Sequence, residues 1–512
     1  MKIGFIRPPQ FLWQTIATEG NNFLMPLNFV ALATFLRERG IKDVKIIDCP
    51  RLKLGWKSLR KKIEEEKFDV IGVHQITLFV HEAAKLLKMV KEVNPKTITI
   101  GGGVHFTAMT EESLENYPFL DFIVRGEGEE TLYELIQELM KSHPDFPSIK
   151  GIAFRDNGKI IKTEFRPLIE NLDSLPFPAY DVLPLDLYRM KGARGAVFGG
   201  VTIEHSRGCA YNCRFCSCWP QMGERKLVNG EEQVFPRWRT KSPQRTLEEI
   251  KRLYYGYGVR DYVWVDDCWN FDSRWTEEFC NLIIKERLKI GWRAFLRVDL
   301  LLRDEKLGIL EKMVKAGLSY VMIGIERGDA GELAGLGKAQ NPEETRELCT
   351  LLKRKYPRVF RMGTLITGIR SETRESFKKV KRYFLSLDID YVSCHPLTPH
   401  PGTPVWKEAK EKGWIEVKDY SQYDWFHPIM PSEHLSREEI FQLNLDLMKQ
   451  RAARPTWALR GLFSRNQYKK RMYWGILFTA FQIHFEALKK GGNPFRITSD
   501  KFQMRKPKWY DS

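Results

Sequence analysis

Three cysteines are grouped in one short stretch of the sequence, where Cys209, Cys213 and Cys216 form a Cys-x3-Cys-x2-Cys run. Thiolates are strong ligands for iron and zinc, and three of them at this spacing supply one metal centre. A cubane of four irons needs four ligands, so three thiolates leave one iron open to a bidentate substrate. The run therefore predicts a catalytic [4Fe-4S] cluster.

A zinc site and a chance group of buried thiols are the alternatives, and Cys218 is available as a fourth ligand. Against zinc, no histidine follows at zinc-finger spacing, and the run directly follows an apolar segment at residues 195–203. Cys218 is expected to line the cavity, because a spacing of two residues is a short reach around an occupied cubane. These features favour the open iron cluster.

The other cysteines are scattered singly, and each is expected to be a small buried side chain: Cys49, Cys268, Cys280, Cys349 and Cys394. They do not form the closely spaced disulfide framework of a short secreted chain. No signal peptide precedes the strand predicted at residues 2–6, and no apolar run approaches the roughly 20 residues of a membrane span. We therefore expect a cytoplasmic protein, soluble or held peripherally at the inner face of the membrane.

The cysteine run resembles the signature of the radical S-adenosylmethionine (radical SAM) superfamily. In that family the open iron binds the amino and carboxylate groups of S-adenosylmethionine, and an electron from the cluster cleaves the sulfonium to give a 5'-deoxyadenosyl radical. The resemblance implies that Cys209, Cys213 and Cys216 hold the cluster. It also implies S-adenosylmethionine as a cofactor and an electron donor of the flavodoxin or ferredoxin type as a partner.

Strands and amphipathic helices alternate through residues 1–150. The strands are predicted at residues 2–6, 44–48, 70–73, 97–100 and 122–124. This alternation predicts a parallel sheet in a doubly wound, Rossmann-like domain. Glycines directly follow two of the strands, which lets a ligand approach the backbone at the carboxyl edge of the sheet.

The two glycine-rich loops read Gly101-Gly-Gly-Val-His-Phe-Thr107 and Arg125-Gly-Glu-Gly-Glu-Glu-Thr131. With the cysteine run downstream at the expected distance, they resemble landmarks of the cobalamin-binding domain of class B radical SAM enzymes. The resemblance implies cobalamin as a third cofactor. It assigns cobalamin binding to Gly101, Gly102, Gly103, His105, Gly126, Glu127 and Gly128.

One familiar cobalamin pattern, Asp-x-His-x-x-Gly after the first strand, is replaced here by Arg7-Pro-Pro-Gln-Phe-Leu-Trp13. A base-off cobalamin without a histidine ligand to cobalt is therefore expected. Three histidines lie in the neighbourhood and are expected to be structural: His74, His81 and His105.

The rest of the chain divides into three parts. Residues 151–195 contain four prolines, which predict an extended linker over the surface. Strands predicted at 262–265, 292–297, 320–326, 363–368 and 391–395 recur at about the spacing of βα units in a barrel. The radical SAM resemblance implies that residues 196–405 form a partial (β/α)6 barrel with its site at the carboxyl ends of the strands. Residues 406–512 are expected to be mainly helical.

Charged residues at predicted strand ends are candidates for holding S-adenosylmethionine. Arg297 suits the methionine carboxylate, whereas Asp267 and Glu326 can accept hydrogen bonds from the amine or the ribose hydroxyls. Internal salt bridges in the barrel mouth are the alternative for each of them. Glu326 lies in Gly324-Ile-Glu-Arg-Gly-Asp329, which resembles the superfamily's Gly-Ile-Glu-Ser-Gly-Asp with Arg327 in place of serine. No side chain is assigned a catalytic role.

The chain carries 82 Lys and Arg against 65 Asp and Glu, a formal charge of +17. No RNA-binding signature with interleaved aromatics is present, so no nucleic acid partner is expected. A solvated basic surface and an anionic membrane are the open alternatives. One aromatic face predicted near the C-terminus, between basic flanks, either packs against the barrel or meets lipid: Trp474, Leu477, Phe478, Phe481, Phe485 and Leu488.

A cobalamin domain joined to a radical domain indicates the reaction. The resemblance implies C-methylation of an unactivated carbon in a hydrophobic substrate, with a membrane lipid as one option. The alternatives are a radical cyclase, of the anaerobic magnesium-protoporphyrin ester type or the type that forms rings in archaeal lipids, and a non-catalytic cobalamin-binding regulator. The intact cysteine run argues against the regulator.

Overall fold

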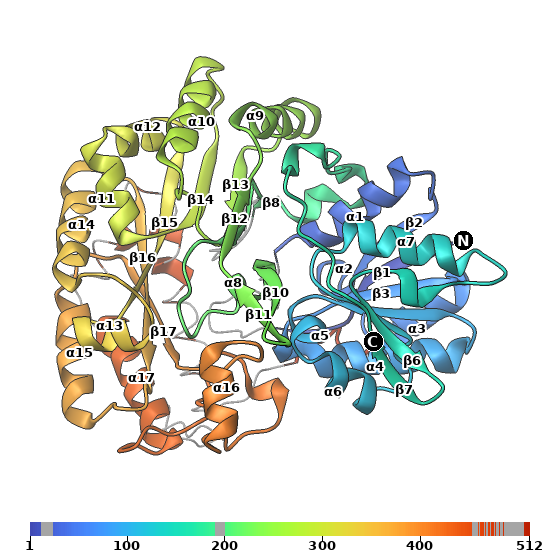
Figure 1. Cartoon of the computed structure of the whole chain (residues 1–512). Coiled ribbons are helices and arrows are strands. Elements are labelled where there is room, and N and C mark those ends of the chain that lie inside the picture. The colour runs from blue at the N-terminus through green and yellow to red at the C-terminus, as the bar shows by residue number, and fades with distance from the viewer. Residues whose placement is uncertain are drawn as a thin grey trace.

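A computed structural model describes residues 1–11, 24–189, 200–452 and 506–512, together with scattered residues between 459 and 485. Two α/β halves lie side by side, with a smaller group of strands between them (Figure 1). The α/β class expected from the sequence is confirmed. Across the described residues, no helix has both the length and the apolar character needed to cross a membrane.

The first half is built on a seven-stranded sheet in the order β2-β1-β3-β4-β5-β6-β7. Its first five strands are parallel: β1 Ile3–Arg7, β2 Val44–Asp48, β3 Val70–His74, β4 Ile98–Gly102 and β5 Phe122–Val124. The helices of this half are α1 Leu27–Glu38, α2 Cys49–Leu52, α3 Trp56–Glu66, α4 Val80–Val93, α5 Val104–Ala108, α6 Thr110–Asn116 and α7 Glu129–Leu139. Side chains alternate along β1, so that Phe5 joins the core under α1 and α7, and Ile6 joins the core under α3 and α4.

Two strands lie within the stretch interpreted as a linker. β6 Ile152–Asp156 and β7 Lys159–Lys162 form an antiparallel hairpin that extends the first sheet. The turn is Asn157-Gly158, with φ of 48° and 79°, which is the conformation that suits a two-residue hairpin loop. Beyond Lys162, up to Leu187, the described chain contains only short turns of 3-10 helix.

The second half is a six-stranded parallel sheet that runs from β8 at one edge to β17 at the other. The strands are β8 Val201–Ile203, β13 Asp261–Trp264, β14 Gly291–Leu296, β15 Leu318–Glu326, β16 Phe360–Thr367 and β17 Tyr391–Pro396. The covering helices are α9 Pro243–Lys251, α10 Ser273–Lys285, α11 Val298–Lys306, α12 Ile309–Lys315, α14 Pro342–Lys355 and α15 Arg374–Ser386 (Figure 1). This is the partial barrel that the resemblance implied.

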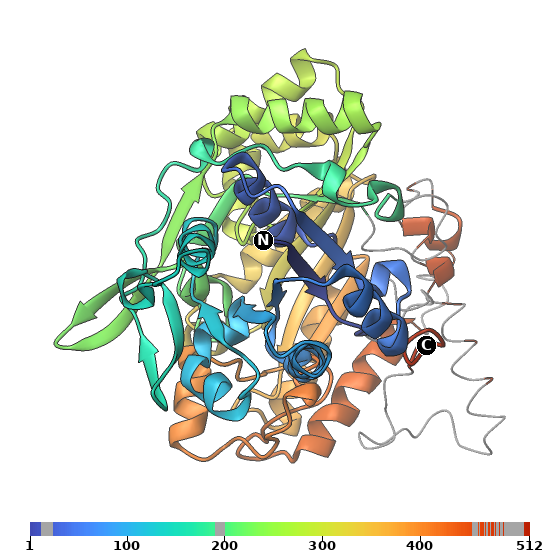
Figure 2. The same cartoon turned by 90° about the vertical axis from the view of Figure 1, so that its right-hand side faces the viewer.

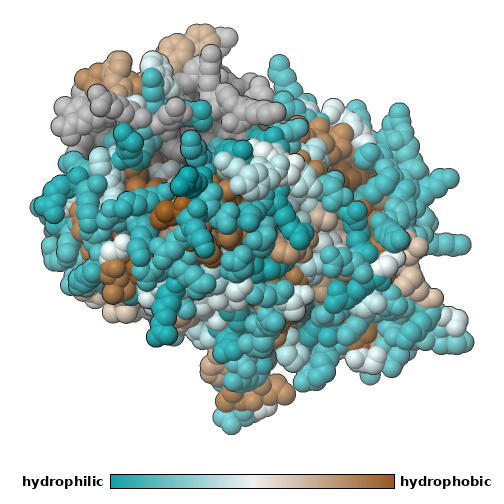
Figure 3. Space-filling model, turned by 90° about the horizontal axis from the view of Figure 1, so that it is seen from above, coloured by the Kyte–Doolittle hydropathy of each residue, from teal (hydrophilic) through white to brown (hydrophobic). Residues whose placement is uncertain are grey.

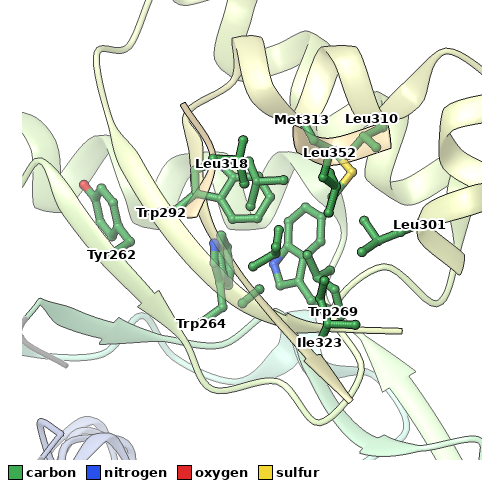
Figure 4. Close-up of a cluster of buried hydrophobic side chains, with 14 of the residues drawn as sticks. Tyr262, Trp264, Trp269, Trp292, Leu301, Leu310, Met313, Leu318, Ile323 and Leu352 are labelled. Atoms are coloured by element: carbon green, nitrogen blue, oxygen red, sulfur yellow. The ribbon is translucent and has the colours of Figure 1, made fainter. Parts of the chain in front are cut away.

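Aromatic packing holds the barrel strands to their helices. Trp269 and Trp292 lie with ring centroids 4.5 Å apart, and both are fully buried. Leucine and methionine side chains from α11, α12 and α14 surround them (Figure 4). Burying an aromatic or leucine side chain contributes about 1.5–3 kcal/mol, so this cluster is a main source of barrel stability.

A small group of elements lies between the halves. β9 Ser206–Cys209 pairs with β12 Arg237–Thr240, and α8 Cys218–Met222 precedes a hairpin of β10 Glu224–Val228 and β11 Glu231–Phe235. The remaining helices are α13 Ala330–Gly335, α16 Pro404–Glu411 and α17 Arg437–Ala452. Residues 506–512 return to the first half (Figure 2), where the Ser512 carbonyl oxygen accepts hydrogen bonds from the backbone N–H groups of Lys57 and Ser58 at 3.0 and 3.1 Å.

Candidate cofactor site between the two halves

A cavity of about 310 Å³ has walls from both halves. The first half contributes α1 and the loops that follow β3, β4 and β5, and the barrel contributes Thr202, Glu204 and Arg207. Six of the seven residues predicted to bind cobalamin line it: Gly101, Gly102, Gly103, Gly126, Glu127 and Gly128. His105 does not. It is buried outside the cavity, with Nδ1 3.3 Å from Thr77 Oγ1 and its ring 5.0 Å from that of Tyr420.

Gly103 and His74 shape the inner end of this cavity. Gly103 has φ +93°, and a Cβ on it would lie 2.6 Å from His74 Cδ2, so only glycine fits without a shift. Burial lowers the pKa of His74 to about 4, which keeps the imidazole neutral. Its ring meets the Phe29 ring edge-on, with the centroids 6.4 Å apart, and it lines the cavity. His74 therefore offers polar atoms to whatever fills an otherwise largely apolar space.

The three predicted cluster cysteines lie close together in the chain at the mouth of the barrel, where Cys209 ends β9 and the loop that follows contains Cys213 and Cys216, and all three are partly exposed. Trp219 Nε1 donates to the Cys213 carbonyl oxygen at 3.0 Å, and the Arg214 N–H donates to the Leu336 carbonyl oxygen at 2.9 Å. Both bonds hold the loop against its surroundings. Among the residues described here, no three His, Cys, Asp or Glu side chains form a group that could hold a single metal ion.

Two further thiols adjoin this loop. Cys268 is buried as expected, and its thiol contacts the predicted cluster ligand Cys209. The hydrogen bond between them lowers the pKa of the Cys209 thiol. Cys218, at the start of α8, donates to Asp267, and its thiol also neighbours Cys216. The contact between Cys268 and Cys209 was not predicted, because Cys268 lies 59 positions after Cys209 in the chain.

Two adjacent carboxylates, Asp266 and Asp267, lie just after β13, and Asp266 supports the strand that leads into the loop. Asp266 Oδ1 accepts hydrogen bonds from the Ser206 N–H and hydroxyl, both at 2.6 Å, and from the His205 N–H at 3.1 Å. Burial raises the pKa of Asp266 to about 7 and that of Asp267 to about 6. Asp266 was not singled out from the sequence, and it fixes the position of β9.

The structure brings Arg297, Asp267 and Glu326 to the same mouth, and each has a protein partner. The Arg297 guanidinium stacks on the Tyr211 ring at 3.5 Å and pairs with Asp299 at 3.0 Å. Glu326, with φ +63°, accepts from Lys338 Nζ and from the Thr364 hydroxyl, each at 2.9 Å. These pairs correspond to the salt-bridge alternative, although a bound ligand can share or exchange them.

Two basic residues near Glu326 have separate tasks. Lys338 is buried and lies close enough to lower the pKa of Cys213, against the larger opposing effect of burial. Arg327, which replaces the superfamily's serine, is fully buried and pairs with Glu332 at 2.8 Å and Glu372 at 2.7 Å. It therefore ties the ends of β15 and β16 together and does not face the mouth.

Comparison with known proteins agrees with this layout. The model of the B12 binding domain matches residues 14–136, and that of the radical SAM superfamily matches residues 203–384. An uncharacterized methyltransferase of Pyrococcus horikoshii is 31% identical over 485 residues, which cover 94% of this chain and 99% of the relative. The chain belongs to the cobalamin-binding radical SAM family.

Other members of this family act in different ways. An anaerobic magnesium-protoporphyrin IX monomethyl ester cyclase of Cereibacter sphaeroides is 29% identical over 79% of this chain and 63% of its own length. A hopanoid C-3 methylase of Methylococcus capsulatus is 25% identical over 84% and 76%. The solved structure of the methyltransferase TsrM from Kitasatospora setae, with cobalamin and a [4Fe-4S] cluster bound, superposes with a TM-score of 0.67 at 16% identity, covering 96% of this chain and all of that one. That likeness shows the shared fold.

This radical SAM enzyme uses a [4Fe-4S] cluster, S-adenosylmethionine and cobalamin. Its residues fit them. Three partly exposed thiols close together in the chain suit a cluster with one open iron. A cradle of glycine backbone, which a Cβ at Gly103 would fill, suits close approach of a large cofactor to the sheet.

The enzyme also has a buried ionic group at the wall of the cavity. Arg207 pairs with Glu127 at 3.0 Å, Glu129 at 2.7 Å and Glu204 at 3.0 Å, and Arg239 pairs with Glu127 at 2.9 Å. Burial works to raise the pKa of Glu127, but the two arginines hold it below its usual value. Glu127 therefore lines the cavity, while its carboxylate pairs with arginines of β9 and β12.

Proposed function

We propose that this enzyme transfers a methyl group to an unactivated carbon of a hydrophobic substrate. One observation carries the proposal: the cobalamin-domain glycine loops and the strand that leads into the cluster loop share the walls of one cavity. When bound, the cluster and S-adenosylmethionine supply a deoxyadenosyl radical that removes hydrogen, and methylcobalamin supplies the methyl group. The relatives named as methyltransferases support the same reaction.

Each cofactor is assigned to residues by their chemistry. Cys209, Cys213 and Cys216 hold the cluster, because their thiols lie close together in the chain, at the end of β9 and in the loop that follows it. Arg297, Asp267 and Glu326 hold S-adenosylmethionine, because they offer a cation and two carboxylates beside that loop. The loops with Gly101, Gly102, Gly103, Gly126, Glu127 and Gly128 hold cobalamin, and His105 supports them from behind.

The lower nucleotide of cobalamin is proposed to fill the cavity beside His74. The walls of this cavity include Phe5, Phe29 and Leu132. Such apolar walls suit the flat benzimidazole base, and the His74 ring can exchange a hydrogen bond with it. In this arrangement cobalt has no histidine ligand from the protein.

A membrane lipid is the proposed class of substrate, and the C-terminal aromatic residues support it. Trp474, Leu477, Phe481 and Phe485 are 54%, 41%, 70% and 51% exposed, so a large part of each side chain is open to solvent. Phe478 and Leu488, also expected on this face, lie outside the described residues. Hydrophilic residues dominate the face shown in Figure 3, and the formal charge is +17. Exposed aromatics on a basic protein suit an anionic lipid surface.

The reaction itself is tested with methyl-deuterated S-adenosylmethionine. Reduced, reconstituted enzyme is incubated with lipid, peptide and pigment extracts, and products are sought by mass spectrometry. We expect a lipid that gains the labelled methyl group together with release of 5'-deoxyadenosine. Label in a peptide or pigment would reject the lipid class but keep the reaction, and deoxyadenosine release with no labelled product would reject methylation.

A cyclase is the second candidate, because the Cereibacter cyclase is 29% identical over 79% of this chain. It predicts a product that has lost two hydrogens and carries no label in the same incubation. Failure to form deoxyadenosine with any extract would instead support a non-catalytic cobalamin-binding protein.

Membrane binding gives a separate expected result. The enzyme should sediment with vesicles of anionic phospholipid at low salt and dissociate as salt rises, because each well-placed Lys or Arg contributes roughly 1 kcal/mol that salt screens. Replacing Trp474, Phe481 and Phe485 by glutamine should abolish sedimentation without a change in melting temperature. Leu227→Gln is the control, since this residue is 77% exposed on the β10 strand. Equal sedimentation of both variants would contradict the assignment.

A further inference from the structure

Two arginines face each other across the strand pair that precedes the cluster loop. In the β9–β12 ladder Arg207 lies opposite Arg239, and Cys209 lies opposite Arg237. Like charges directly opposite on paired strands are destabilising. Here both guanidinium groups are buried, with Arg207 8% and Arg239 4% exposed, so water screens their repulsion poorly.

The counter-charge comes largely from the other half of the molecule. Glu127 pairs with both arginines, and Glu129, the first residue of α7, pairs with Arg207 at 2.7 Å. The barrel itself supplies Glu204. The Glu127 carboxylate also accepts from the Ile169 N–H at 2.7 Å, which fixes its orientation. The strand pair is thus neutralised only when the cobalamin-binding loop is docked on it.

The same side chains face the cavity. Glu127, Glu129, Glu204 and Arg207 all line it, and Arg207 precedes the cluster ligand Cys209 by two residues on one strand. A continuous path of buried ion pairs and backbone therefore runs from the wall of the cobalamin cavity to the first cluster ligand.

We propose that Arg207 is a positioning residue through which cluster assembly and cobalamin binding favour each other. Cluster assembly fixes the position of Cys209, and with it β9 and the Arg207 guanidinium group, called here the Arg207 fork. The fork then holds Glu127 and Glu129 where they form the cavity wall, so cobalamin meets a wall that is already ordered. When the first cofactor has ordered these residues, the second binds without the entropy cost of ordering them, so the two cofactors bind with positive coupling. By linkage, cobalamin must stabilise the assembled cluster in turn.

The test compares cobalamin affinity in two forms of the full chain. Hydroxocobalamin binding is measured anaerobically by equilibrium dialysis, with the cluster reconstituted and without it. We expect reconstitution to tighten binding of the wild-type chain about tenfold, within the usual range of coupling between two sites. Glu129→Gln keeps the shape of the side chain and removes one charged partner of Arg207. In this variant the ratio of cobalamin affinity with the cluster to affinity without it should fall to about twofold or less.

Arg237→Gln is the matched control. Arg237 is the ladder partner of Cys209, but its side chain is 45% exposed and pairs with Glu170 at the surface. Arg237→Gln should keep the wild-type ratio of affinities. Arg207→Gln should lower this ratio as Glu129→Gln does. If Arg207→Gln fails to fold, the result for Glu129→Gln is sufficient for the test. Equal affinity with and without the cluster in the wild type, or a ratio unchanged in Glu129→Gln, would overturn the proposal. The outcome does not depend on the substrate.

Discussion

Anaerobic reconstitution of the wild-type chain should yield about four irons and four sulfides per chain, since one cluster motif is present. Replacing Cys209, Cys213 and Cys216 by alanine should remove the cluster and all 5'-deoxyadenosine formation. The reason is chemical: without thiolates no open iron is left to bind and reduce S-adenosylmethionine. Iron and sulfide analysis, the electron paramagnetic resonance of the reduced cluster and chromatography of deoxyadenosine measure the loss.

Two single variants serve as controls for the triple variant. Cys218→Ala should keep about four irons, because Cys218 donates to Asp267 and is not needed as a fourth ligand. Cys349→Ala removes a fully buried thiol in the barrel core and controls for a general loss of folding. Full iron content in the triple variant would sink the cluster assignment, and loss of the cluster in Cys218→Ala would show a closed site with four thiolates.

Features that depend on residues close together in the chain could be predicted from the sequence. The apolar strands are set by residues close together in the chain, and the structure has them near the predicted positions. The glycines expected to follow the strand at 97–100 are partly within it, because β4 extends to Gly102. The hairpin of β6 and β7 was missed although its turn, Asn157-Gly158, is a strong hairpin signal. Prolines further along the same stretch favoured a linker, and the two strands are short.

Long-range pairs could not be predicted in the same way. Glu127 was assigned to cobalamin from its loop, but the two arginines that pair with its carboxylate, Arg207 and Arg239, lie 80 and 112 positions further along the chain. Nothing in a single sequence shows which buried cation meets which carboxylate, because docking of the two halves decides it. The same holds for Glu326 and Lys338 across α13.

Gly103→Val should reduce the affinity for cobalamin about a hundredfold. At φ +93° a β-branched residue costs about 1–3 kcal/mol of backbone strain. Its Cβ would also lie 2.6 Å from the His74 ring and push it into the cavity, and crowding of this kind adds about 1–3 kcal/mol. The backbone strain lowers the stability of the folded chain whether or not cobalamin is bound. The crowding is expected to appear in binding, because the displaced side chain occupies the space of the cofactor, and a hundredfold loss corresponds to about 2.7 kcal/mol. Equilibrium dialysis with hydroxocobalamin measures it.

Gly40→Val is a matched control in the same half of the molecule. Gly40 has φ +92°, but a Cβ on it would meet nothing within 4 Å, so the variant carries the same backbone strain without touching the cavity. It should bind cobalamin as the wild type does.

Cobinamide, which lacks the lower nucleotide, should bind equally to His74→Phe and to the wild type, whereas cobalamin should bind the variant more weakly. The cob(II)alamin spectrum should show no nitrogen splitting from a protein histidine; splitting that disappears in His74→Phe, with weaker cobinamide binding, would make His74 a ligand of cobalt instead.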